Sequence, residues 1–246
     1  RSTLFPYTTL FRSGSCKMVV LDVDGTLLTN EKTVTARTRA TLIKVQQMGI
    51  KVVLASGRPT YGVVGLAKEL ELDKNGGYIL SYNGGQIINV QTNELLFEKR
   101  IDPGFIPYLE RKAQKNGFAI FTYREDEMLT NDASNERVLQ EARLNGMQLR
   151  ETDRFSEEVS FQPCKVMLSS DDEKALVGLE EHWKKRLAGT LDVFRSETYF
   201  LEVVPQFIDK ANTLSVLLEK LNIPSADIVA IGEDRKSTRL NSSHGS

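Results

Sequence analysis

The sequence has few of the residues that several common kinds of site require. Only two residues are cysteine, Cys16 and Cys164, and only two are histidine, His182 and His244. Two distant cysteines outside any Cys-x-x-Cys pattern exclude a disulfide scaffold and a structural zinc site, and they favour a reducing cytoplasm. Two histidines leave little room for a His-based triad or a His-rich metal site. We therefore expect any chemistry to depend on carboxylates, lysine, serine or a metal.

An excess of one charge and long hydrophobic runs are also absent. Lys and Arg total 32 and Asp and Glu total 33, which gives a net charge of −1. This balance offers no argument for a nucleic-acid partner or an anionic membrane surface. No run of 18 apolar residues occurs, so no segment is expected to span a bilayer. The 40% of hydrophobic residues is ordinary for a globular chain with a substantial core.

The two ends of the sequence differ in character from the rest. Residues 1–13 contain no acidic residue, and residues 234–246 are polar and basic. Both stretches resemble translated sequencing-adapter DNA, and segments of this kind are set aside before a fold is considered. Two disordered native tails are the alternative. We therefore expect residues 14–233 to be the native part, flanked by two adapter-derived tails.

Four short apolar runs between these ends have the character of buried strands. Each is continuous rather than alternating, as in parallel strands covered on both faces, and helical patterns lie between them. The runs are Met18–Leu21, Val52–Ala55, Tyr78–Ser81 and Ile228–Ile231, and the helical patterns cover 35–48, 60–70 and 209–221. This alternation predicts an α/β fold with a Rossmann-like, doubly wound parallel sheet. Ligand sites of such sheets lie beyond the carboxyl ends of the strands.

The stretch 89–195 has a different pattern. It contains strand signals at 117–123 and 165–170 and a helical pattern over 171–187. A segment of about a hundred residues with its own strands and helices is too long and too structured for a loop. We therefore predict an inserted α+β domain at 89–195, within a core formed by 14–88 and 196–233.

The sharpest chemical signal follows the first apolar run, at Asp22-Val-Asp24-Gly25-Thr26. Side chains two residues apart on a strand point to the same face, so the two acids can reach one centre. One carboxylate can then form an aspartyl-phosphate, and the other can act as a general acid and base. Two neighbouring acids also favour a hard cation such as Mg²⁺. An Asp-Gly turn with a helix cap is the alternative, but the fully apolar run before it favours a site.

Three other positions carry side chains that suit a phosphate site. Ser56 and Gly57 follow the second run, where a hydroxyl and backbone N–H groups bind phosphate oxygen well, although Ser56 equally suits a helix N-cap. Lys210 begins the last helical pattern and can neutralise a phosphoryl group, with a solvated surface lysine as the alternative. Asn83 can lie beside a substrate, and a plain turn is at least as good an explanation. The absence of a GxxxxGK[ST] loop disfavours a nucleotide-binding ATPase.

Together these motifs resemble those of the haloacid dehalogenase superfamily of phosphotransferases, and of its Cof-type sugar-phosphatase branch in particular. The resemblance extends from about Lys17 to Glu233 and includes an inserted α+β cap. It implies that Asp22 is the nucleophile, that Asp24 is the general acid and base, and that Ser56 and Lys210 complete the catalytic set. The residues it implies for phosphate or substrate binding are Thr26, Gly57, Arg58 and Asn83. In one departure from the branch, Ala211 stands where glycine is usual.

The resemblance ends inside the fourth motif of the family, Gly-Asp-x-x-Asn-Asp. Here Gly232 is followed by Glu233 and then by the adapter-like stretch. We infer that this stretch supplies the last base of codon 233, which would turn an aspartate codon into a glutamate codon. We therefore expect that the native residue at this position is aspartate and that roughly thirty to fifty further residues follow it. The resemblance implies that Mg²⁺ binds Asp22, Asp24 and the acid at 233, and we expect the chain as written to be weakly active or inactive.

The resemblance thus predicts a Mg²⁺-dependent phosphatase of small phosphorylated metabolites, such as sugar phosphates, acting through an aspartyl-phosphate. Two alternatives stay open, a phosphomutase on the same scaffold and a non-enzymatic phospho-acceptor of the receiver type. The large insertion argues against the receiver, because receivers are compact single domains. We expect a cytoplasmic enzyme with a small-molecule substrate and with neither a nucleic-acid nor a membrane partner.

Overall fold

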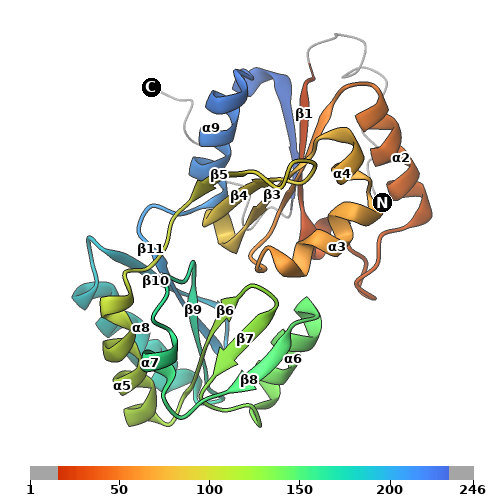
Figure 1. Ribbon diagram of the computed structural model, residues 1–246. Coiled ribbons are helices and arrows are strands. Elements are labelled where there is room, and N and C mark those ends of the chain that lie inside the picture. The colour runs from red at the N-terminus through yellow and green to blue at the C-terminus, as the bar shows by residue number, and fades with distance from the viewer. Residues whose placement is uncertain (1–15, 233–246) are drawn as a thin grey trace.

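The structure, a computed structural model, describes residues 16–232 and divides them between two six-stranded sheets (Figure 1). The first and last segments of the described residues meet in one sheet, which forms a core domain, and the middle of the chain forms a cap domain. The predicted tails 1–13 and 234–246, and Glu233, lie outside the described residues. The arrangement confirms the predicted α/β core with an inserted α+β cap.

The core sheet has the strand order β12-β1-β2-β3-β4-β5. Its first four strands pair in parallel, and the antiparallel pairs β3-β4 and β4-β5 extend the predicted parallel sheet. Strands β1, β2 and β3 are buried, as their apolar runs predict, whereas the edge strand β12 is more exposed. The strands are β1 (Met18–Asp22), β2 (Lys51–Ala55), β3 (Tyr78–Ser81), β4 (Gln86–Asn89), β5 (Leu95–Glu98) and β12 (Ile228–Ile231).

Helices cover both faces of the core sheet, as a doubly wound fold requires. Helices α2, α3 and α4 pack on the face that carries Leu21 and Leu54, and α9 packs on the face that carries Val20 and Val53. Successive side chains of a strand point to opposite faces, so both faces need apolar residues. The helices are α2 (Ala36–Gln47), α3 (Tyr61–Glu69), α4 (Leu72–Asn75) and α9 (Lys210–Leu221).

The cap sheet has the order β10-β11-β9-β6-β7-β8 and is antiparallel except for the pair β7-β8. Its strands are β6 (Ala119–Arg124), β7 (Glu127–Thr130), β8 (Gln148–Glu151), β9 (Val166–Ser169), β10 (Leu191–Glu197) and β11 (Phe200–Pro205). Its helices are α5 (Ile106–Asn116), α6 (Glu136–Asn145), α7 (Phe155–Glu158) and α8 (Glu173–Arg186). Helices α5, α7 and α8 cover one face of this sheet around the buried Trp183. The other face packs on α6 and on Tyr82 of the core, so the cap is docked on the core.

Sheet membership corrects the predicted cap boundaries of 89–195 at both ends. Strand β5 pairs with β4 in the core, and β11 pairs with β9 and β10 in the cap. The chain therefore crosses between the domains at 99–101 and again at 206–208. The two crossings are joined, because Lys99 Nζ donates a hydrogen bond to the carbonyl oxygen of Gln206 at 2.8 Å. The apolar run of β11 suits a buried strand in either sheet, so its pattern alone did not identify its partners.

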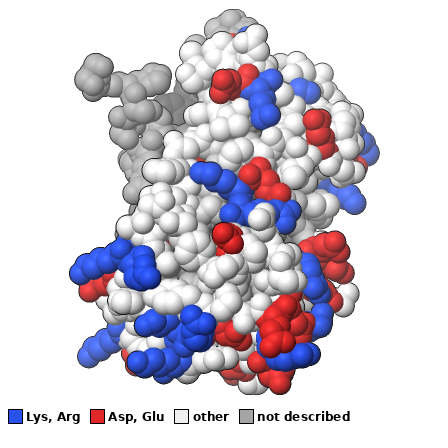
Figure 2. Space-filling model, turned by 60° about the vertical axis from the view of Figure 1, so that its left-hand side comes forward, with Lys and Arg blue, Asp and Glu red and all other residues white. Residues whose placement is uncertain are grey.

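No helix of the described part of the chain is both long and apolar enough to cross a membrane. Acidic and basic side chains both occur across the face drawn in Figure 2, in keeping with the near balance of charges in the sequence.

The turn after β3 is fitted tightly against the start of α9. Tyr82, Asn83 and Gly84 all have positive φ values, of 52°, 58° and 108°. The Thr213 hydroxyl of α9 donates a hydrogen bond to the carbonyl oxygen of Gly84 at 2.8 Å. A Cβ atom on Gly84 would lie 2.6 Å from the backbone oxygen of Asp209, so only glycine allows this approach. The contact sets the place of α9, and with it the place of Lys210.

We expect Gly84→Ala to lower the free energy of unfolding by about 2 kcal/mol or more, because the methyl group meets backbone atoms at a positive φ. Gly178→Ala in α8 is the matched control, since a Cβ there meets nothing within 4 Å. The control should stabilise the protein by about 0.5–1 kcal/mol through helix propensity. Urea denaturation measures both. A Gly84→Ala variant as stable as the unchanged chain would contradict this packing.

Candidate active site

The carboxyl ends of the parallel core strands bring the predicted catalytic residues together. Asp22 ends β1 and is paired in register with Ala55, the residue before Ser56. Asp209 caps α9 by accepting a hydrogen bond from the backbone N–H of Asn212 at 2.7 Å, so Lys210 is the first residue of the helix. The Lys210 ammonium forms an ion pair with Oδ1 of Asp22. The predicted nucleophile and the predicted phosphate-binding lysine are thus direct neighbours.

Asp24 does not lie on the strand, contrary to the expectation of two acids on one strand face. After Asp22 the chain enters a wide turn over Val23–Leu27, with Gly25 at a φ of 80°. Thr26 lies in this turn and is half-buried. The turn directs the Asp24 carboxylate toward the loop after β2, where Arg58 is located.

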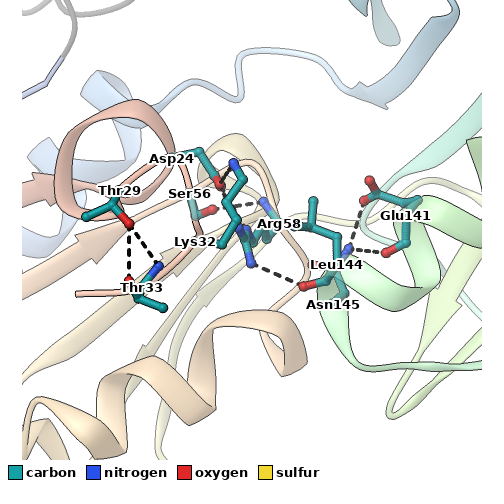
Figure 3. A network of polar contacts seen from close by, with 9 residues as sticks. All are labelled: Asp24, Thr29, Lys32, Thr33, Ser56, Arg58, Glu141, Leu144 and Asn145. Carbon is teal, nitrogen blue, oxygen red and sulfur yellow. Dashed lines mark hydrogen bonds and ion pairs between the residues drawn. The ribbon is translucent and has the colours of Figure 1, made fainter. Parts of the chain in front are cut away.

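The Asp24 carboxylate is held by two cations (Figure 3). The Arg58 guanidinium donates to its two oxygens at 2.6 and 2.8 Å, and Lys32 Nζ lies 3.0 Å from Oδ1. Burial raises the pKa of Asp24, but the hydrogen bonds and charges of Arg58 and Lys32 outweigh it, so the pKa is lowered from its ordinary value. Asp24 is therefore ionised at neutral pH in this arrangement.

Ser56 is buried and fixed by the sheet beneath it. Its backbone N–H donates to the carbonyl oxygen of Leu80 in β3 at 2.8 Å, and its hydroxyl oxygen accepts from the backbone N–H of Arg58 at 3.1 Å. The backbone N–H of Asn83 donates to the carbonyl oxygen of Ser56 at 3.0 Å. A Cβ atom on Gly57 would lie 2.7 Å from Oδ1 of Asn83, so the asparagine packs directly on the glycine. The turns after β2 and β3 therefore form one unit.

Residues of the cap complete the surroundings of this unit. The carbonyl oxygen of Leu144, in α6, accepts a hydrogen bond from the Arg58 guanidinium at 3.3 Å. Lys165 and Glu202 also contact the core, at Gly57 and Asn83. The sequence reasoning missed Lys32, Lys165 and Glu202. A single carboxylate inside the apolar run of β11 was the signal that marks Glu202 as buried and in need of a partner.

A hollow of about 870 Å³ adjoins Asp22, the predicted nucleophile. Asp22, Asn83 and Lys210 of the core line it, together with Phe194 and Arg195 of the cap. Its volume lies in the range of small-molecule sites. The structure therefore leaves room for a small metabolite beside Asp22.

Within residues 16–232 no three His, Cys, Asp or Glu side chains are grouped to hold a metal ion. The described part of the chain offers the Asp22 carboxylate and the carbonyl oxygen of Asp24, both hard oxygen donors of the kind that Mg²⁺ prefers. The third predicted ligand, Glu233, lies outside the described residues. Because Mg²⁺ keeps several water ligands and needs only one or two carboxylates, this donor set fits the ion.

The chain is similar to several known proteins over most of its length. The family model described as haloacid dehalogenase-like hydrolase matches residues 19–236. A solved haloacid dehalogenase-like hydrolase from Bacteroides thetaiotaomicron has 43% identity and a TM-score of 0.88, covering 92% of this chain and 84% of its own. A Streptococcus pyogenes protein provisionally named a phosphatase is 26% identical over 222 residues, 89% of this chain and 81% of its own. The HMP-PP phosphatase of Yersinia pseudotuberculosis is 24% identical over 219 residues, 88% of this chain and 77% of its own.

These matches confirm the predicted resemblance, and the predicted class of phosphoric monoester hydrolase agrees with them. Because the family match extends over most of its length, the chain belongs to the haloacid dehalogenase-like hydrolase family.

Proposed function

We propose that this enzyme hydrolyses small phosphorylated metabolites, such as sugar phosphates, through an aspartyl-phosphate on Asp22. The observation that carries the proposal is the ion pair of Asp22 with Lys210 at the end of β1. It lies beside an open hollow and beside the turn after β2 that contains Ser56 and Gly57, here called the Ser56 turn. A carboxylate next to a lysine and a hydroxyl can attack a phosphoryl group whose oxygens are neutralised by the same neighbours. The phosphatase names of two relatives support the same reaction.

The proposed reaction has two steps on this scaffold. An oxygen of Asp22 attacks phosphorus, and the bond between phosphorus and the leaving oxygen breaks. Asp24 gives the leaving oxygen a proton, which releases the alcohol. Asp24 then takes a proton from water, whose oxygen attacks phosphorus and frees Asp22. Ser56 and Lys210 bind the phosphoryl oxygens through both steps.

Asp24 needs a proton for the first step, although Arg58 and Lys32 hold it ionised in the structure. A bound phosphate group is a second anion near Asp24 and competes for both cations. Both effects raise the pKa of the carboxyl group and favour its protonated form. Substrate binding thereby prepares the acid.

We further propose Mg²⁺ as the cofactor, held by Asp22, the carbonyl oxygen of Asp24 and the acid at 233. The ion would supply positive charge against the phosphoryl oxygens and the two acids. Lys210 lies on one oxygen of Asp22 only, at Oδ1, so its contact leaves Oδ2 for such a ligand.

In a version of the chain that carries the complete fourth motif, Asp22→Asn should reduce the release of phosphate from p-nitrophenyl phosphate by at least about a thousandfold, because an amide cannot act as the nucleophile. The matched control is Asp227→Asn, at the opposite end of the sheet. Asp227 has the same 18% side-chain exposure as Asp22 and also pairs with a lysine, Lys17. The control should stay within about twofold of the unchanged chain. Undiminished release by Asp22→Asn contradicts the mechanism, and a single labelling event without steady release indicates a phospho-acceptor.

Arg58→Met should move the acid limb of the pH profile of kcat to higher pH. Cleavage of the aspartyl-phosphate requires ionised Asp24, so turnover is lost as the pH falls through the pKa of Asp24. Arg58 lowers that pKa, and its removal lets the pKa rise toward the ordinary value. The release of phosphate from the phosphorylated enzyme, followed as a function of pH, measures the shift. An acid limb that is unmoved or lies at lower pH would argue against Asp24 as the base.

Removal of divalent cations with a chelator should lower turnover by about a hundredfold or more, and added Mg²⁺ should restore it. Melting temperatures with and without the ion separate a catalytic effect from loss of the fold. Full turnover after chelation would show that the reaction needs no metal.

A further inference from the structure

A buried ion pair of the cap reaches into the phosphate site of the core. Lys165, the residue before β9, and Glu202, in β11, lie 3.2 Å apart, and their side chains are only 3% and 5% exposed. Lys165 Nζ also donates to the carbonyl oxygen of Gly57 at 3.0 Å. Asn83 Nδ2 donates to Oε2 of Glu202 at 3.0 Å. Each charge of the pair is therefore bound to one of the two turns that surround the predicted phosphoryl-binding site.

The contact of Lys165 acts on the peptide that joins Gly57 to Arg58. The carbonyl oxygen of this peptide accepts from Lys165, and its N–H donates to the hydroxyl oxygen of Ser56 at 3.1 Å. A peptide unit is planar, so a cation that fixes its oxygen also fixes the direction of its N–H. The N–H in turn holds the Ser56 oxygen and leaves the hydroxyl proton free to donate to a phosphoryl oxygen. The cap thus influences Ser56 through one rigid peptide.

The contact of Glu202 acts on the second turn. Asn83 has a positive φ of 58° and packs its carboxamide against Gly57. Its side-chain N–H donates to Glu202 and its backbone N–H donates to the carbonyl oxygen of Ser56 at 3.0 Å. Glu202 therefore fixes the orientation of the amide that covers the Ser56 turn.

Stability alone gives little reason for two charges at this place. Removing an ammonium and a carboxylate from water is unfavourable for each ion, and replacing such a pair by apolar residues of similar size often leaves stability unchanged or raises it. Within the cap, Tyr123 offers Lys165 only its ring, with the centroid 5.5 Å from Nζ. The strongest partners outside the pair are the two core turns, which indicates that the pair serves the contact with the core.

We propose that Lys165 and Glu202 are positioning residues of the phosphoryl-transfer site. With the cap docked, they orient the Gly57–Arg58 peptide and the Asn83 amide, and thereby the hydroxyl of Ser56. The site is then complete only when the cap encloses the substrate, so chemistry is coupled to closure. This inference rests on the phosphatase function proposed above.

Replacing the pair by apolar residues, in Lys165→Met with Glu202→Leu, tests the proposal in the full chain. We expect kcat/KM for p-nitrophenyl phosphate in Mg²⁺ to fall by tenfold or more, mainly through kcat. The melting temperature should be unchanged or higher, because the desolvation cost is removed. The matched control is Arg150→Met with Glu158→Leu, an ion pair of 2.5 Å in the same cap with a more exposed arginine. Its kcat/KM should change less than twofold.

A Ser56→Ala background separates a positioning role from a general loss of structure. If the pair acts through the Ser56 hydroxyl, its replacement in this background should lower kcat/KM by less than about threefold relative to Ser56→Ala alone. The reason is that the effects of coupled residues do not add. Effects that multiply in full would overturn the proposal. So would a pair variant whose kcat/KM stays within twofold of the unchanged chain.

If the pair variant does not fold, Glu202→Gln takes its place. A neutral amide holds the Lys165 ammonium less strongly, and we expect a three- to tenfold loss of kcat/KM; a change below twofold at an unchanged melting temperature would overturn the proposal. Asp22-dependent turnover that is insensitive to the pair would overturn this inference alone. Turnover that does not depend on Asp22 would overturn the proposed function together with it.

Discussion

The parallel pairing of β1 with β2 is the constraint on which the candidate site depends. Asp22 is in register with Ala55, so the residue that follows, Ser56, emerges from the sheet at the same edge. Strand β3 extends that register, because the carbonyl oxygen of its Leu80 accepts a hydrogen bond from the backbone N–H of Ser56. The turn after β3 packs against the start of α9 through the close approach at Gly84, and α9 begins with Lys210. A change in this register would separate Asp22, the proposed nucleophile, from every group that is proposed to bind the phosphoryl oxygens.

Contacts between the domains act on the same few residues. Arg58 holds Asp24 with one part of its guanidinium and reaches the carbonyl oxygen of Leu144 in the cap with another. The buried charges of the cap contact Gly57 and Asn83 on the other side of the Ser56 turn. The acid, the hydroxyl and the amide of the site are therefore all linked to the docked cap. In this account the cap does more than enclose a substrate, since its position also influences the chemical groups of the core.

The parts of this site that could be predicted from the sequence are those with a local signal. Apolar runs that end in polar turns located Asp22 and Ser56, because parallel strands bring their carboxyl ends to one edge. The start of the last helical pattern located Lys210. The partners of Asp24 carried no such signal, since they depend on a turn with a positive φ at Gly25 and on an arginine 34 positions away. The cap contacts join residues separated by 108 and 119 positions. Local patterns mark such residues as buried charges but do not identify what they face.

The proposed mechanism requires that Asp22 carries the phosphoryl group during turnover. Borohydride reduces an acyl phosphate to an alcohol and so converts an aspartyl-phosphate into homoserine. We would quench the enzyme with borohydride while it turns over p-nitrophenyl phosphate in Mg²⁺, and determine the peptide around β1 by mass spectrometry. We expect homoserine in place of Asp22, with Asp24 unmodified. Steady turnover with an unmodified Asp22, or homoserine at any other position, would contradict it.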